Sequence, residues 1–159
     1  MINIVDLFNY ILKYKPKDEV ESIENTVFDY DKCSQFLPLQ HGEMAFCSSV
    51  YDGDTIRLCW KSKGKNVRSL CRIDGIDTPE LKGSSDYEKE LAIKARDRLS
   101  QVVSGKFVTI INPGLEKFGR ILADIETNEI ESIKDFMLSD TTIARPYNGG
   151  TKTKWDEKS

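Results

Sequence analysis

The spacing of apolar residues changes from helical to extended at Gly42, and this change constrains the fold more than any other feature. Residues 44–50, 55–60 and 67–74 are short and rich in β-branched, aromatic or cysteine residues. Turn-forming sequences separate them, Asp-Gly-Asp at 52–54 and Ser-Lys-Gly-Lys-Asn at 62–66. Short extended runs joined by such turns predict a three-stranded meander.

A helical pattern follows the meander. Within residues 87–103, Leu91, Ala95, Leu99 and Val102 recur on one helical face, and Ser104-Gly105 ends the pattern. Residues 107–111 and 118–126 predict two more strands, and residues 130–138 a final short helix. Five strands with a helix after the third is the order of an OB-fold. We therefore expect an α+β domain, a five-stranded OB-fold β-barrel with capping helices.

The segment before Gly42 differs from the barrel region. Ile4, Leu7, Phe8 and Ile11 have helical spacing, and Pro16 closes the stretch. The polar face of this helix is not basic, which favours packing on protein over lying on a membrane. The pattern is lost over residues 29–41. We expect residues 1–41 to form a helical N-terminal extension and connector, and residues 42–159 to form the barrel domain.

Bulk properties exclude several classes of protein. No apolar run approaches the ~20 residues of a membrane-spanning helix, and the N-terminus lacks the basic lead-in of a signal peptide. The cysteines contain no Cys-x-x-Cys pair, which argues against a zinc site. Three of the four lie in predicted strands and are expected to be reduced core residues; these are Cys47, Cys59 and Cys71, whereas Cys33 lies in the connector. These observations indicate an intracellular, cytoplasmic protein without membrane contact.

The net charge of −3 argues against binding nucleic acid through bulk electrostatics. The balance is uneven, however. Residues 1–41 carry seven acidic and four basic side chains, whereas residues 42–159 carry nineteen of each. The excess acidity therefore belongs to the N-terminal extension and leaves the barrel region neutral.

Three charged clusters carry the functional prediction: Asp-Gly-Asp-Thr at 52–55, Arg72 with Asp-Thr-Pro-Glu at 77–80, and Lys-Phe-Gly-Arg at 117–120. Each alone is typical of a turn or a strand surface. A meander, however, brings its first turn and the end of its third strand to one side, so Asp54 and Asp77 could converge. Two carboxylates with a backbone carbonyl suit Ca²⁺. Glu80, three residues beyond Asp77, lies where a general base would act.

Together with Ala-Arg-Pro-Tyr-Asn-Gly-Gly at 144–150, these motifs resemble the staphylococcal nuclease (thermonuclease) family over roughly residues 42–150. The resemblance implies a Ca²⁺-dependent endonuclease or exonuclease that hydrolyses DNA or RNA and leaves 5′-hydroxyl and 3′-phosphate ends. It implies Ca²⁺ ligation by the carboxylates of Asp54 and Asp77 and by the carbonyl of Thr78.

The same resemblance assigns the remaining roles. Glu80 activates the attacking water, and Arg72 and Arg120 grip the scissile phosphate. Nucleotide contacts come from Lys117, Phe118 and Tyr147. The chemistry needs such groups, because attack on a phosphodiester concentrates negative charge on the phosphate oxygens and an arginine fork can bind two of them. We expect loss of Glu80 or of either arginine to stop turnover and to leave the fold largely intact.

The main alternative is a non-catalytic OB-fold module that binds single-stranded nucleic acid. The presence of all five charged site residues favours an enzyme. A second alternative makes the N-terminal helix a partner-binding or oligomerisation element. The sequence also departs from the family pattern: the loop after Glu80 is short, Arg145 replaces an aromatic residue, and Phe118 lacks a hydroxyl. Asp74 is expected to be solvated or structural, and an indirect role beside the metal site is the alternative. Trp155 is expected to pin the C-terminal tail to the barrel.

Overall fold

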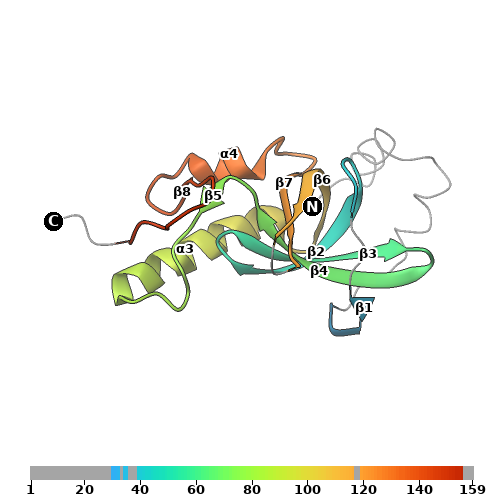
Figure 1. Cartoon of the computed structure of the whole chain (residues 1–159), viewed down its shortest axis with the longest axis horizontal. Helices are drawn as coiled ribbons and strands as arrows, with labels where there is room; N and C mark the ends of the chain where they lie inside the picture. The colour runs from blue at the N-terminus through green and yellow to red at the C-terminus, as the bar shows by residue number, and fades with distance from the viewer. Residues whose placement is uncertain (1–29, 33, 36–38, 117–118, 156–159) are drawn as a thin grey trace.

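The computed structural model describes residues 30–32, 34–35, 39–116 and 119–155 (Figure 1). The helix predicted over residues 4–12 lies outside these residues, as do Cys33, Lys117 and Phe118. Among the described residues, no helix is both long and apolar enough to cross a membrane.

The predicted meander is present. Strands β2 (Met44–Asp52), β3 (Thr55–Ser62) and β4 (Lys65–Ile73) pair antiparallel in sequence order. The β3–β4 turn contains Lys63 and Gly64, both at positive φ (48° and 75°). Two successive residues at positive φ match the twist of a tight hairpin.

Two further strands close the barrel. β6 (Lys106–Leu115) pairs with β2, and β7 (Ile121–Glu126) pairs antiparallel with β6. β7 also pairs parallel with β4, with Cys71 opposite Ile121. The pairing of β7 with β4 therefore closes the sheet, which confirms the five-stranded OB-fold barrel.

Two helices cover the barrel. Helix α3 (Asp86–Val103) begins at Ser85, whose hydroxyl accepts a hydrogen bond from the Glu88 amide at 3.1 Å. Its buried face, Leu91, Ala95 and Leu99, joins the barrel core. The short helix α4 (Ile133–Leu138) begins at Ser132 and lies against β7.

The barrel interior is apolar. Along β7, residues Ile121, Ala123 and Ile125 are buried and alternate with partly exposed neighbours. Cys47, Cys59 and Cys71 are buried and form no disulfide, one on each strand of the meander, which confirms their prediction as reduced core residues. Burial raises the pKa of the Cys47 thiol to about 12.

Some boundaries differ from the prediction. β6 runs to Leu115 through a bulge between Ile111 and Gly114, where Asn112 has a φ of 48°. The bulge interrupts the alternation of side chains and so hides the end of the strand. The last helix begins three residues later than predicted, because Ser132 caps it: its hydroxyl accepts from the Asp135 amide at 3.1 Å.

Part of the predicted connector contacts the barrel. The 3₁₀ turn η1 (Tyr30–Lys32) precedes β1 (Ser34–Gln35), which pairs parallel with β4. The carbonyl of Tyr30 accepts a hydrogen bond from Arg68 at 2.7 Å. Both elements are too short to produce a periodic pattern, so the sequence did not predict them.

A second, smaller sheet lies outside the barrel. β5 (Ile76–Asp77) pairs antiparallel with β8 (Arg145–Pro146), so that Asp77 lies opposite Arg145 (Figure 1). This pairing brings the C-terminal segment to the end of the meander.

Candidate active site

The turn between β2 and β3 fixes Asp54 in a buried position, 3% exposed. The Asp54 carbonyl accepts a hydrogen bond from the Ile73 amide at 2.8 Å, which ties the turn to the end of β4. Gly53 lies so close to Ala95 and Thr78 that a Cβ atom there would be 2.6 Å from the Ala95 methyl and 2.7 Å from the Thr78 hydroxyl. Only glycine therefore allows this approach of turn, loop and helix.

Asp54 has two polar partners. Its Oδ1 accepts a hydrogen bond from the Thr55 hydroxyl at 2.8 Å, and its Oδ2 forms a very short ion pair with Arg72. Burial raises the pKa of the Asp54 carboxyl to about 7, whereas the positive charge of Arg72 acts in the opposite direction. The carboxyl is thus desolvated and depends on the neighbouring cation.

Arg72 lies at the end of β4 and is itself buried. Besides Asp54, its guanidinium donates to the carbonyl of Ile76 at 2.8 Å and lies 3.6 Å from Glu116. The Tyr147 ring centroid is 5.7 Å from the guanidinium carbon. Arg72 is therefore held on several sides before any substrate arrives.

Glu116 links the two arginines of the predicted site. Its Oε2 accepts a hydrogen bond from Nε of Arg120 at 2.7 Å, while its Oε1 faces Arg72. The turn between β6 and β7 enforces this geometry, because Glu116 and Arg120 also pair through backbone N–H to carbonyl at 3.0 Å. The sequence analysis did not identify Glu116, which lies just before the Lys-Phe-Gly-Arg motif.

Asp77 is the most enclosed carboxylate of the site, with its side chain 1% exposed. Its Oδ2 accepts from two nitrogens of Arg145, at 2.8 and 3.1 Å. Nζ of Lys152 lies 2.8 Å from its Oδ1 and 2.5 Å from Oε1 of Glu80. The contact at Oδ1 lacks the geometry of a hydrogen bond, so this buried oxygen keeps acceptor capacity.

Lys152 is the cation that joins Asp77 to Glu80. Burial acts to lower the pKa of Lys152, but its charge interactions with Asp77 and Glu80 and its hydrogen bond to Glu80 outweigh burial and raise the pKa above the usual value. Arg145 and Lys152 both come from the C-terminal segment, and neither was predicted as a site residue.

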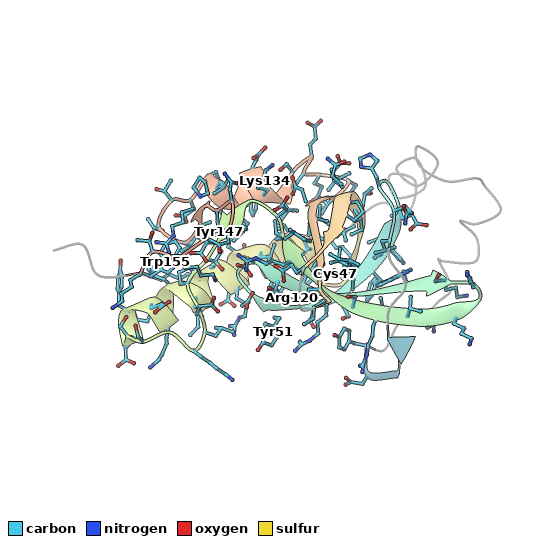
Figure 2. The ribbon with its side chains drawn as sticks, in the orientation of Figure 1. Cys47, Tyr51, Arg120, Lys134, Tyr147 and Trp155 are labelled. Carbon is cyan, nitrogen blue, oxygen red and sulfur yellow. The ribbon has the colours of Figure 1, made fainter. Side chains whose placement is uncertain are left out.

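The C-terminal segment is fixed around Arg145. The guanidinium donates to the carbonyls of Thr153, through a very short contact, and of Lys154, at 3.3 Å. It also lies 4.0 Å from the centroid of the Trp155 ring, which packs against the core. Figure 2 shows Tyr147 and Trp155 on the same side of the molecule. The prediction that Trp155 pins the tail is confirmed.

Several of these groups line a cavity of about 790 Å³, whereas Asp77, Thr78 and Arg145 are not on its wall. The predicted residues on its wall are Asp54, Arg72, Glu80, Arg120 and Tyr147. Five carboxylates line the cavity against three cations, Arg72, Arg120 and Lys152, so the wall carries formal negative charge. Asp74 lines it too but is exposed, as predicted.

The carboxylates of the site are ligands of the kind that a hard divalent cation prefers. Asp54 and Asp77 offer carboxylate oxygens, and one of them, Oδ1 of Asp77, is buried without a hydrogen bond. The cavity wall also has surplus negative charge. In the part of the chain that the structure describes, however, no three His, Cys, Asp or Glu side chains are gathered as a ready cage. Arg72, Arg145 and Lys152 contact the carboxylates instead.

Comparison with known proteins adds an independent observation. The family model described as staphylococcal nuclease homologue matches residues 70–155, more than half of the chain. A search of curated proteins found no match. The matched range contains Arg72, Asp77, Glu80 and Arg120, whereas Asp54 precedes it. With the closed five-stranded barrel, this match shows that the chain belongs to the staphylococcal nuclease family, a family of nuclease and nucleic-acid-binding domains.

Proposed function

We propose that this protein is a Ca²⁺-dependent nuclease that hydrolyses phosphodiester bonds of DNA or RNA with little sequence specificity, leaving 5′-hydroxyl and 3′-phosphate ends. One observation carries the proposal: two arginines and a partly exposed glutamate, Arg72, Arg120 and Glu80, line one cavity beside buried carboxylates. The two arginines can bind a phosphate, and the glutamate can act as a base toward water.

The arginines would bind the scissile phosphate. Arg120 is partly exposed and reaches the cavity from the β6–β7 turn, whereas Arg72 lies deeper. Both are permanently charged, and Glu116 fixes their relative position. Donors that are already oriented stabilise the charge that develops on phosphate oxygens without further rearrangement.

Glu80 would orient and deprotonate the attacking water. Its side chain is 54% exposed, so the carboxylate can reach a water in the cavity. Lys117, Phe118 and Tyr147 would contact the nucleotide. Tyr147 is well placed for this role, because its hydroxyl is anchored to the Gly150 carbonyl at 2.8 Å while its residue lines the cavity.

Asp54, Asp77 and the carbonyl of Thr78 would hold the Ca²⁺ ion. Bound there, the ion would add positive charge beside the phosphate. Asp77 lies on β5 and Thr78 follows it directly, so both are positioned by the pairing of β5 with β8. Asp54 is positioned by its turn.

The experiment compares cleavage of plasmid and single-stranded DNA with Ca²⁺ and with a chelator. We expect degradation with Ca²⁺ alone. Glu80→Gln and Arg120→Ala should each lower the rate about 10²–10³-fold. The matched controls Glu90→Gln and Arg96→Ala change side chains on α3 outside the cavity and should cleave like the wild type.

A non-catalytic binding module is the alternative, and the contacts of Lys152 and Arg145 with the acidic residues are compatible with it. Its signature would be retention of single-stranded DNA in a gel shift without cleavage in Ca²⁺. That result, or normal cleavage by Glu80→Gln, would reject the proposed enzyme.

We also propose that residues 42–159 form the nuclease domain and residues 1–41 an N-terminal helical extension and connector. Removal of residues 1–29 tests this division while keeping η1 and β1, which contact β4. Cleavage should persist in the shortened chain. Comparison of the two chains by size-exclusion chromatography would reveal whether the extension mediates oligomerisation.

A further inference from the structure

Lys152 lies where two carboxylates of the site face each other. Its Nζ is 2.8 Å from Oδ1 of Asp77 and 2.5 Å from Oε1 of Glu80. No other cation contacts this oxygen of Asp77 among the described residues, since Arg145 binds only Oδ2. The lysine ammonium is thus placed at the oxygen that a metal ion would require.

Contacts made by the residues before and after Lys152 in the chain fix its position. Two residues upstream, the Gly150 carbonyl accepts a hydrogen bond from Tyr147. Downstream, Arg145 binds the carbonyls of Thr153 and Lys154 and stacks on Trp155. Anchors on both sides therefore present the lysine to the cavity, whereas an ordinary surface lysine would be solvated.

The two cations on Asp77 differ in how easily they can leave. Arg145 is a planar fork with several partners, which hold it on Oδ2. Lys152 has a flexible four-carbon stem and a side chain that is 37% exposed, so its ammonium can rotate into solvent. Asp77 is buried and would be costly to leave without a cation.

We propose that Lys152 is the built-in cation of the site, which neutralises Asp77 and Glu80 in the metal-free protein and is displaced when Ca²⁺ binds. This inference rests on the proposed function. An ammonium and a calcium ion cannot share Oδ1 of Asp77, since both are positive and need the same oxygen. Displacement of Lys152 therefore lowers the apparent affinity for Ca²⁺, because only the fraction of molecules with a free Oδ1 can bind.

Calorimetric titration with Ca²⁺ tests the inference without relying on cleavage. Lys152→Met keeps the aliphatic stem and removes the competing charge, so Ca²⁺ should bind about tenfold tighter than to the wild type. The matched control is Lys154→Met, which removes the same charge from the same segment at an exposed position. It should change the affinity less than about twofold, because exposed charges are screened. Lys152→Arg should bind like the wild type.

Thermal unfolding supplies a second readout. Without Ca²⁺, Lys152→Met should melt at a lower temperature than Lys154→Met, and saturating Ca²⁺ should raise its melting temperature by more. Equal or weaker Ca²⁺ binding by Lys152→Met than by Lys154→Met would overturn the inference, as would equal melting temperatures of the two metal-free variants.

Asp54→Asn separates this inference from the metal assignment. Binding of Ca²⁺ by the wild type and its loss in Asp54→Asn would support the metal site whatever Lys152→Met does. Failure of every variant, Lys152→Met included, to bind Ca²⁺ would reject both ideas. Binding by Lys152→Met in the absence of measurable binding by the wild type would support the competition most directly.

Discussion

The barrel interior and the charged cavity share strand β4, yet they are filled by opposite kinds of side chain. On this strand Cys71 and Ile73 enter the apolar core, while Arg72 between them enters the cavity. Burial of apolar surface in the interior stabilises the fold. Burial of charge at the cavity costs desolvation, which ion pairs offset incompletely. The comparison indicates that the interior maintains the fold, whereas the buried charges of the cavity have no comparable stabilising role.

Removal of Arg72 should have the largest effect on the free energy of unfolding. Arg72→Ala leaves the buried Asp54 carboxylate without its cation and should lower the free energy of unfolding by about 3–5 kcal/mol. This differs from the expectation, based on sequence alone, that loss of Arg72 leaves the fold largely intact. The double variant Asp54→Leu/Arg72→Met should recover most of the loss. Urea unfolding followed by circular dichroism measures both, and a double variant no more stable than the single one would contradict the reasoning.

Truncation of a core side chain tests the other region. Leu58 on β3 is fully buried, so Leu58→Ala should cost about 2–5 kcal/mol through lost contacts and a cavity. Ile93→Ala, at an exposed position on α3, is the control and should cost less than about 0.5 kcal/mol. Ca²⁺ affinity should be unchanged in both. A change in affinity for Leu58→Ala would show that the two regions are not separate.

Release of the C-terminal segment should have the smallest effect on stability. Arg145→Ala removes the contacts with Asp77, the Thr153 carbonyl and Trp155, and should cost about 0.5–2 kcal/mol. Trp155 emission should shift to longer wavelength, and trypsin should cut faster at Lys152 and Lys154. Arg98→Ala is the control, since Arg98 stacks on Phe136 instead. Unchanged emission in Arg145→Ala would show that Arg145 does not hold the tail.

Much of the fold could be predicted from sequence because local patterns of residues determine its strands and helices. The strands of the meander are rich in β-branched, aromatic or cysteine residues and end at turn residues, and α3 repeats its apolar face over several turns. The end of β6 was not predictable, since a bulge breaks its alternation. β1 was missed because two residues cannot display a period.

The site was predictable only in part. Asp54, Arg72, Glu80, Arg120 and Tyr147 stand in short motifs, and the structure brings them to one cavity. Arg145 and Lys152 have no such signal, because their partners lie 68 and 72 residues away in the chain. Only the pairing of β5 with β8 brings them together. The departure of Arg145 from the pattern of the family that the sequence resembles was the single available hint.

The close packing of Gly53 against Thr78 and Ala95 matters for engineering this domain. The β2–β3 turn, the segment at Thr78 and helix α3 meet there without spare volume. Most substitutions at position 53 would therefore displace the turn that carries Asp54. Diversity is better introduced at Lys82 and Ser84, which follow Glu80 in the chain and are exposed. Selection for altered substrate preference could then proceed while the framework beneath stays constant.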